Sequence, residues 1–133
     1  MLLTTALTCL ALNVYYEGRG ESDLGKRIIA QTTMNRSEHN RSKVCKEVLR
    51  PNQFSWVKRN VKGKTLMAKP SGKSWIESQT IAKKALSHRV ITPSKYRNVT
   101  HFHSVNVHPK WSRKMIYLGR VGHHHFYSLK SKS

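Results

Sequence analysis

The chain has 133 residues, a length that fits one domain, residues 1–133, with a single hydrophobic core. It carries 25 Lys and Arg residues against 6 Asp and Glu, a formal net charge of +19, so we expect attraction to polyanions such as nucleic acid, anionic lipid or teichoic acid. No apolar run approaches the roughly 20 residues that span a bilayer, and we expect no stable membrane insertion.

The apolar start of the chain, residues 1–14, predicts a helix. Thr4 or Thr5 can cap it, because a threonine side chain accepts a hydrogen bond from the free backbone N–H groups of the first turn. Gly18 and Gly20 would end it. The stretch lacks a basic leading segment and a small-residue cleavage site. We therefore interpret it as a structural helix and not as an export signal.

Three more helices are expected. Ser22 would cap the first of them, over residues 23–36, and a short helix would follow over residues 42–49. After a long connecting region, residues 52–72, Ser74 would cap the last helix.

The last third of the chain favours strands. Branched and aromatic residues are frequent over residues 99–103, 115–118 and 121–127, and turn residues separate these segments. A short basic tail, residues 128–133, follows. Helices followed by a small antiparallel sheet predict an α+β fold.

The two cysteines, Cys9 and Cys45, are far apart in the sequence. One hypothesis is a disulfide between them. We expect instead two buried thiols that pack as small hydrophobic side chains.

Glu17 is the strongest candidate for chemistry among the six acidic residues. It follows a valine and two tyrosines at the end of an apolar helix, and their burial would raise the pKa of its carboxyl group, as a general acid near neutral pH requires. Gly18 would leave the space beside it open. The alternative is that Glu17 pairs with Arg19 as a solvated charge, and Glu21 and Asp23 could simply complement a helix dipole.

His101 and His103 alternate on a predicted strand, so their side chains would share one face. Together with a histidine of the triplet 123–125 they could bind zinc. We expect them instead to form hydrogen bonds in a groove, and we expect no metal and no cofactor. Trp56, in an irregular segment, is the aromatic residue best placed to stack on a sugar or a base.

Residues 11–22 have the sequence ALNVYYEGRGES. This segment resembles the YGEARGE signature of the SleB-type cell wall hydrolases, the family of spore cortex-lytic enzymes that also includes phage endolysins. Residues 99–104 (VTHFHS) resemble its ATHYHA segment. Further matches follow the order of the family's motifs, so that the resemblance extends from about residue 10 to residue 127; they cover residues 28–36, 44–56, 107–112 and 120–127.

This resemblance implies a lysozyme-like α+β domain that acts on peptidoglycan, with Glu17 as the catalytic glutamate and Glu21 as a site organiser or substrate contact. Gly18 stands where the family has alanine, which would loosen the motif locally. His123 stands where the family has asparagine, so that the histidine of the motif falls on His124. The residues that we expect to contact substrate are Tyr16, Glu21, Gln53, Phe54, Trp56, His101, His103 and His124.

The scarcity of acids favours a lytic transglycosylase. A retaining glycosidase needs a second carboxylate about 5 Å away and an inverting one needs it about 6.5–9.5 Å away, and only Glu21 or Asp23 could serve. A transglycosylase needs Glu17 alone, which protonates the oxygen between MurNAc and GlcNAc and then helps the C6 hydroxyl close a 1,6-anhydro ring. The resemblance favours this route as well. A lysozyme-type hydrolase (muramidase) is the alternative.

Two further classes stay open: a basic nucleic-acid-binding protein, for which no motif is found, and a His-metal amidase that cuts the stem peptide. We expect a monomeric phage endolysin, made in the host cytoplasm and released to the periplasm or cell wall by a separate membrane-permeabilising protein. Its charge would attract anionic envelope polymers and, without specificity, nucleic acid.

Overall fold

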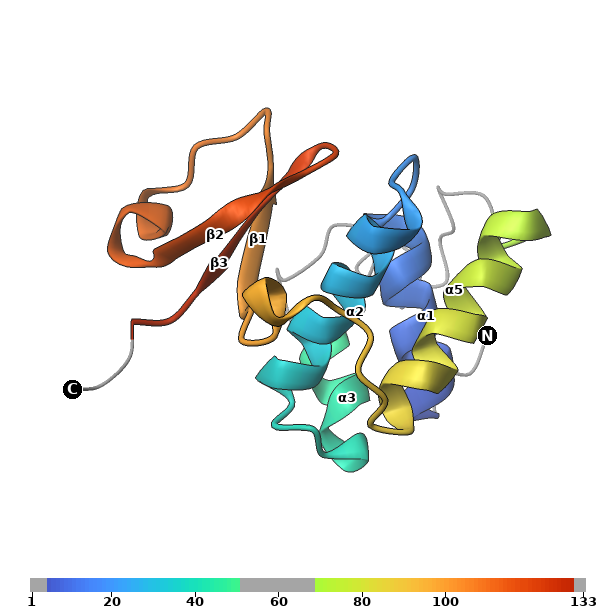
Figure 1. Ribbon diagram of the computed structural model, residues 1–133. Helices are drawn as coiled ribbons and strands as arrows, with labels where there is room; N and C mark the ends of the chain where they lie inside the picture. The colour runs from blue at the N-terminus through green and yellow to red at the C-terminus, as the bar shows by residue number, and fades with distance from the viewer. Residues whose placement is uncertain (1–4, 51–68, 131–133) are drawn as a thin grey trace.

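The computed structural model describes residues 5–50 and 69–130 and has the α+β fold predicted from the sequence. Helices occupy one side of the molecule and a three-stranded antiparallel sheet occupies the other (Figure 1). The helices described are α1 (Ala6–Glu17), α2 (Asp23–Arg36), α3 (Arg41–Val48) and α5 (Gly72–Leu86). Within these ranges no helix combines the length and the hydropathy that a bilayer crossing requires.

Most of the predicted helix starts are confirmed. The side chain of Thr5 accepts a hydrogen bond from the Thr8 backbone N–H, and that of Ser22 accepts one from Gly25. The predicted cap at Ser74 is wrong, because α5 already begins at Gly72. The backbone of Gly72 has a φ of 74°, which glycine adopts readily, so the chain enters the helix two residues earlier than expected.

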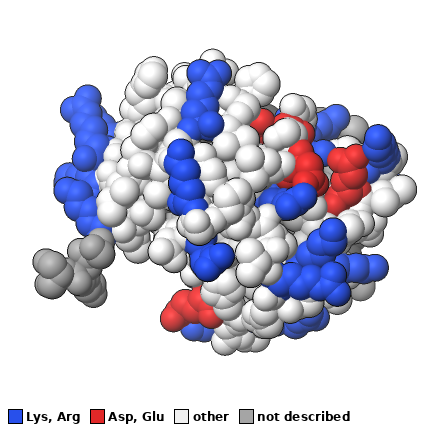
Figure 2. All heavy atoms as spheres, viewed as in Figure 1, with Lys and Arg blue, Asp and Glu red and all other residues white. Residues whose placement is uncertain are grey.

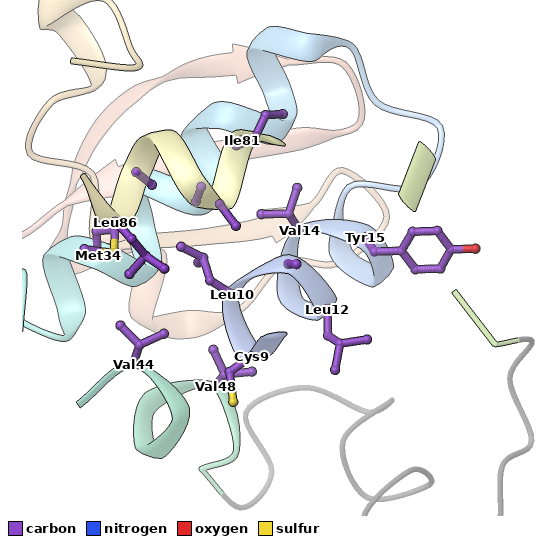
Figure 3. Close-up of a cluster of buried hydrophobic side chains, with 14 of the residues drawn as sticks. Cys9, Leu10, Leu12, Val14, Tyr15, Met34, Val44, Val48, Ile81 and Leu86 are labelled. Carbon is purple, nitrogen blue, oxygen red and sulfur yellow. The ribbon is translucent and has the colours of Figure 1, made fainter. Parts of the chain in front are cut away.

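Helix α1 lies at the centre of the helical core. Leu10, Leu12 and Val14 are at most 2% exposed, and they cluster with side chains from the other helices (Figure 3). Val44 of α3 and Ile81 of α5 belong to the same cluster. A helix with apolar residues all round its surface is stable only when it is surrounded. Core packing therefore explains the apolar residues of α1.

The expectation of two separate thiols is wrong: Cys9 of α1 and Cys45 of α3 form a disulfide, with their Cα atoms 5.3 Å apart. Val44 and Val48 pack α3 against α1, and this packing brings the two cysteines face to face. A cross-link that closes a loop of this length stabilises the fold by about 2–4 kcal/mol.

The sheet has the order β1-β3-β2 and consists of β1 (His101–Ser104), β2 (Ile116–Val121) and β3 (His124–Ser128). The first strand begins two residues later than predicted, and the second extends to Val121, beyond the expected end. A register shift between Tyr117 and Gly119 interrupts the pairing of β2 with β3. One face of the sheet packs on α2 through a second core cluster: Ile28, Ile29, Tyr96, Val99 and Phe126.

Candidate active site

Glu17 is the last residue of α1 and is half-buried. Val14, Tyr15 and Tyr16 before it are all less than 9% exposed, as the sequence predicted. The helix ends at Gly18, whose N–H donates to the Val14 carbonyl at 2.8 Å. The carboxyl group therefore projects from the end of a buried, apolar helix.

The expected open space beside Gly18 is absent. A Cβ atom on this residue would lie 2.6 Å from the Val14 carbonyl oxygen and 2.9 Å from Cγ of Lys26. The glycine that replaces the family's alanine therefore fits a tight contact and does not loosen the motif. Gly20 differs, because its φ is 77° and a Cβ there would meet nothing within 4 Å.

A groove with a volume of about 560 Å³ lies between the second half of α2 and β1. His101 and His103 both line it, so the two alternating histidines share one face as predicted. Its other walls are formed by Thr32, Thr33, Arg36, Thr100, Phe102, Val107, Pro109 and Trp111. The lining combines imidazole, hydroxyl and guanidinium groups with an indole ring, which suits a ligand rich in hydroxyl groups.

Glu17 is not one of the described residues that line this groove, but α1 connects it to the groove wall. Asn13, one helical turn before Glu17, accepts a hydrogen bond of 2.6 Å from the Thr33 hydroxyl. Residues four positions apart share one face of a helix. Glu17 therefore lies on the face of α1 that contacts the groove wall at Thr33.

Arg36 positions His101 at the groove. Its Nη1 donates to Nε2 of His101 at 2.8 Å, so the imidazole proton must be on Nδ1, which donates to the Thr100 hydroxyl at 2.9 Å. Burial, with the Arg36 charge as a second cause, lowers the pKa of His101. The buried Glu47 carboxylate holds Arg36 in place, with Oε1 and the Arg36 Nε 3.3 Å apart. His101 is therefore a neutral polar wall of the groove.

His103 is held on both ring nitrogens. Its Nδ1 donates to the Ser104 carbonyl at 2.8 Å, which leaves Nε2 to accept from the Tyr127 hydroxyl, also at 2.8 Å. The rings of His103 and Tyr127 stack with centroids 5.2 Å apart. Trp111 contacts both His101 and His103, at 5.2 and 5.7 Å.

Glu21 fastens the turn between β2 and β3 to the start of α2. Its side chain is 2% exposed, and Oε1 accepts hydrogen bonds of 2.9 Å from the His123 backbone N–H and from His124 Nδ1. A Cβ on Gly122 would lie 1.8 Å from Oε2, so only glycine leaves room for the carboxylate. Of the two roles expected for Glu21, these contacts favour the site organiser.

His124 is not one of the described residues that line the groove. Its neighbour His125 pairs with His103, so His124 points to the opposite face of the sheet, where it packs edge-on against Phe102 with ring centroids 5.3 Å apart. Burial lowers its pKa, although the hydrogen bond that it donates to Glu21 acts in the opposite direction. The structure therefore separates His124 from His101 and His103. Among the described residues no three His, Cys, Asp or Glu side chains are grouped so that they could hold a metal ion.

Of the remaining expected contacts, Tyr16 is 7% exposed and packs edge-on against Tyr15, with ring centroids 5.1 Å apart. Gln53, Phe54 and Trp56 lie outside the described residues. Arg36 and Trp111 were not among the expected substrate contacts. Trp111 lies in the segment 107–112 that resembles a family motif, whereas nothing near Arg36 in the sequence indicates its contact with His101.

A family model described as Cell Wall Hydrolase matches residues 20–127. No curated protein and no solved structure matched the chain. The matched segment includes Glu21, His101 and His103 and begins after Glu17, so the role of Glu17 is supported by its motif and its position and not by this match. The match spans most of the sequence, and the chain belongs to the cell wall hydrolase family, enzymes that act on peptidoglycan.

Proposed function

We propose that this enzyme cleaves the glycosidic bond between MurNAc and GlcNAc as a lytic transglycosylase, with Glu17 as both the acid and the base. The observation that carries the proposal is that Glu21, Asp23, Glu38, Glu47 and Glu77 are each bound by a cation or by the β2–β3 turn, so none of them offers a second carboxylate. A glycosidase that uses two carboxylates needs a second one that is available to a nucleophile or to water.

The next acidic residue along the chain, Glu21, is held by the turn between β2 and β3 and is buried. Asp23 pairs with Arg27 on the surface of α2. The remaining three pairs are Glu38 with Lys43, Glu47 with Arg36 and Arg50, and Glu77 with Lys26. This distribution supports a mechanism with one carboxyl group.

In the proposed reaction Glu17 donates its proton to the bridging oxygen as the bond from that oxygen to C1 of MurNAc breaks. The C6 hydroxyl of the same sugar then bonds to C1, and its proton passes to the Glu17 carboxylate. No water is consumed, and the acid is regenerated in its starting form. The nucleophile belongs to the substrate, so the second step is intramolecular and gains from proximity.

The groove supports a sugar polymer as the ligand. The indole of Trp111 can stack on the apolar face of a pyranose ring, and the threonine hydroxyls and Arg36 can bond its hydroxyl groups. Because burial lowers the pKa of His101, its imidazole stays uncharged at neutral pH, and Arg36 supplies positive charge to the groove wall.

A muramidase is the second candidate, since the family description names a hydrolase. In that case water takes the place of the C6 hydroxyl, and the product carries a reducing MurNAc end. The same Glu17 would protonate the leaving oxygen. The two reactions therefore differ in their products and not in their acid.

We also propose that the enzyme is a phage endolysin, made in the host cytoplasm and released to the wall. The disulfide supports work outside the reducing cytoplasm, because disulfides persist in oxidising compartments. Lys and Arg are spread over the surface seen in Figure 2, which supports contact with anionic envelope polymers after release.

The test is digestion of purified peptidoglycan by wild type and Glu17→Gln, with mass spectrometry of the fragments. We expect anhydro-muropeptides from wild type and a loss of turnover of about 10²–10⁴-fold in the variant, the usual contribution of a general acid. Glu38→Gln is the matched control, since it makes the same isosteric change in an exposed ion pair. Reducing MurNAc ends would indicate the muramidase.

Two results would contradict the proposal altogether. Free stem peptides, with activity lost to a chelator and restored by zinc, would indicate the amidase. Unchanged turnover by Glu17→Gln would show that Glu17 is not the acid.

A third result concerns nucleic acid. Binding to nucleic acid that vanishes with added salt, while digestion stays intact, would show that nucleic acid is bound by charge attraction alone.

A further inference from the structure

The face of the sheet that points away from α2 carries a continuous array of rings. Directly opposed residues of an antiparallel pair share one face, and His103 pairs with His125 while Tyr117 pairs with Tyr127. Trp111 of the short helix η2 (Lys110–Lys114) packs on the same face. We call these five residues, His103, Trp111, Tyr117, His125 and Tyr127, the outer-face array.

The members of the array contact one another without a gap. Trp111 lies 5.5 Å from Tyr127, Tyr127 lies 5.4 Å from Tyr117, and Tyr117 lies 5.5 Å from His125, all between ring centroids. Tyr127 is 8% exposed and lies beneath the others, whereas Trp111 is 38% and Tyr117 52% exposed. Two large aromatic side chains are therefore accessible at opposite ends of a rigid platform.

Hydrogen bonds within the array fix these rings. The Tyr117 hydroxyl lies 2.8 Å from His125 Nδ1, as the Tyr127 hydroxyl does from His103 Nε2. Desolvation lowers the pKa of His125, and the charge of a protonated His103 is the second cause. Desolvation raises the pKa of Tyr117. At neutral pH the Tyr117 hydroxyl therefore donates to the uncharged imidazole of His125.

Cations surround the array. Lys110, Arg113 and Lys114 of η2 and Arg120 of β2 are all exposed, and no acidic residue follows Glu77 in the chain. Figure 2 shows Lys and Arg at the end of the molecule that the sheet and η2 occupy in Figure 1, with no Asp or Glu visible at that end. The cations therefore favour a ligand that carries negative charge and also has apolar ring faces that can stack on the array.

The array is continuous with the groove, because His103 and Trp111 belong to both. We propose that a peptidoglycan strand bound in the groove continues over the outer face, with sugar rings stacked on Trp111 and Tyr117. The carboxylates of its stem peptides would meet the cations of η2 and β2. This inference rests on the proposed function, and it assigns the recognition of long strands to the edge strand β2.

Binding to purified sacculi tests the proposal in a Glu17→Gln background, which prevents digestion during the measurement. We expect Tyr117→Ala to weaken co-sedimentation about 3- to 10-fold, the effect of losing one stacked ring. Tyr117→Phe keeps the ring and should bind like the parent. Ile116→Ala is the matched control, because Ile116 is 42% exposed and points to the other side of the same strand. Equal melting temperatures would show that the variants are folded.

A second measurement uses the active enzyme and soluble glycan fragments of two lengths. Tyr117→Ala should lower turnover of long strands and leave turnover of fragments that fill only the groove unchanged. Equal loss on both lengths, or no loss of binding to sacculi, would overturn the inference while leaving the role of Glu17 intact. Turnover that survives Glu17→Gln would instead defeat the proposed function, whatever Tyr117→Ala does.

Two competing ligands are distinguished by the same variant. The binding defect should persist with sacculi stripped of teichoic acid, because the proposed ligand is the glycan strand. A defect seen only with teichoic acid present would overturn the proposal in favour of that polymer. An equal defect in binding to duplex DNA, with DNA displacing sacculi, would overturn it in favour of nucleic acid.

Discussion

The helical half and the sheet half of this enzyme use their charged and aromatic residues in opposite ways. All six acidic residues belong to the helical half, and Tyr15 and Tyr16 are buried in its core. The sheet half has no acidic residue and displays rings and cations at its surface. In the proposed mechanism the proton donor belongs to the helical half, and the strand binds in the groove between α2 and β1 and over the outer face of the sheet. Their alignment then depends on the contacts that join them, chiefly Glu21 with the β2–β3 turn and Arg36 with His101.

The largest expected effect on the helical half comes from its disulfide. Cys45→Ser, or reduction of wild type, should lower the free energy of unfolding by about 2–4 kcal/mol, because the unfolded chain is no longer constrained. Urea unfolding with and without a reductant measures this. Reduction should have no further effect on Cys45→Ser, and equal stability of reduced and oxidised wild type would contradict the prediction.

Two tryptophans test the difference between the halves, because Trp75 lies in the helical half and Trp111 in the sheet half. Trp75 packs on Tyr15, with ring centroids 5.8 Å apart, and Trp75→Ala should lower the free energy of unfolding by about 2–3 kcal/mol. Trp111→Ala should change stability by less than about 1 kcal/mol and weaken binding to sacculi about 3- to 10-fold. Unfolding and co-sedimentation of both variants would test the division. The same loss of stability in both would show that Trp111 is a structural residue.

Glu21→Ala tests the contact between the halves. It would leave the His123 backbone N–H and His124 Nδ1 without their acceptor, at an expected cost of about 1–3 kcal/mol of unfolding free energy. The β2–β3 turn would move away from α2, and kcat should fall. Glu21→Gln keeps an acceptor oxygen in place and should recover much of both quantities. If Glu21→Ala retained full stability and lost all activity, a direct role in the chemistry would be indicated instead.

The smallest expected effect is the pH dependence of stability. The pKa values of His101 and His124 are lowered in the folded state, so the unfolded chain binds protons first as the pH falls below about 6.5. Their contribution to stability is therefore present above that pH and lost below it. Unfolding between about pH 7.5 and pH 5 should show this decline, and His124→Asn should make it shallower. A rise in stability on acidification would contradict the assignment.

Much of the helical half was predictable because its determinants are local. Thr5 and Ser22 cap helices through side chains that reach backbone groups within three residues, and the apolar residues of α1 repeat at helical spacing. The predicted cap at Ser74 was wrong because Gly72, two residues earlier, could turn the chain into α5. The placement of His101 and His103 on one face was predictable in the same way, since alternation along a strand is a local property.

Three features followed from the sequence alone: the α+β class, the burial around Glu17 and the scarcity of acids that favours one carboxyl group. Three contacts became visible only in the folded protein: Cys9 with Cys45, Glu21 with the β2–β3 turn, and Arg36 with His101. These contacts join residues between 36 and 103 positions apart. Such contacts are set by how whole helices and strands pack, and residue type and spacing along the chain do not encode that packing in a form that can be read locally.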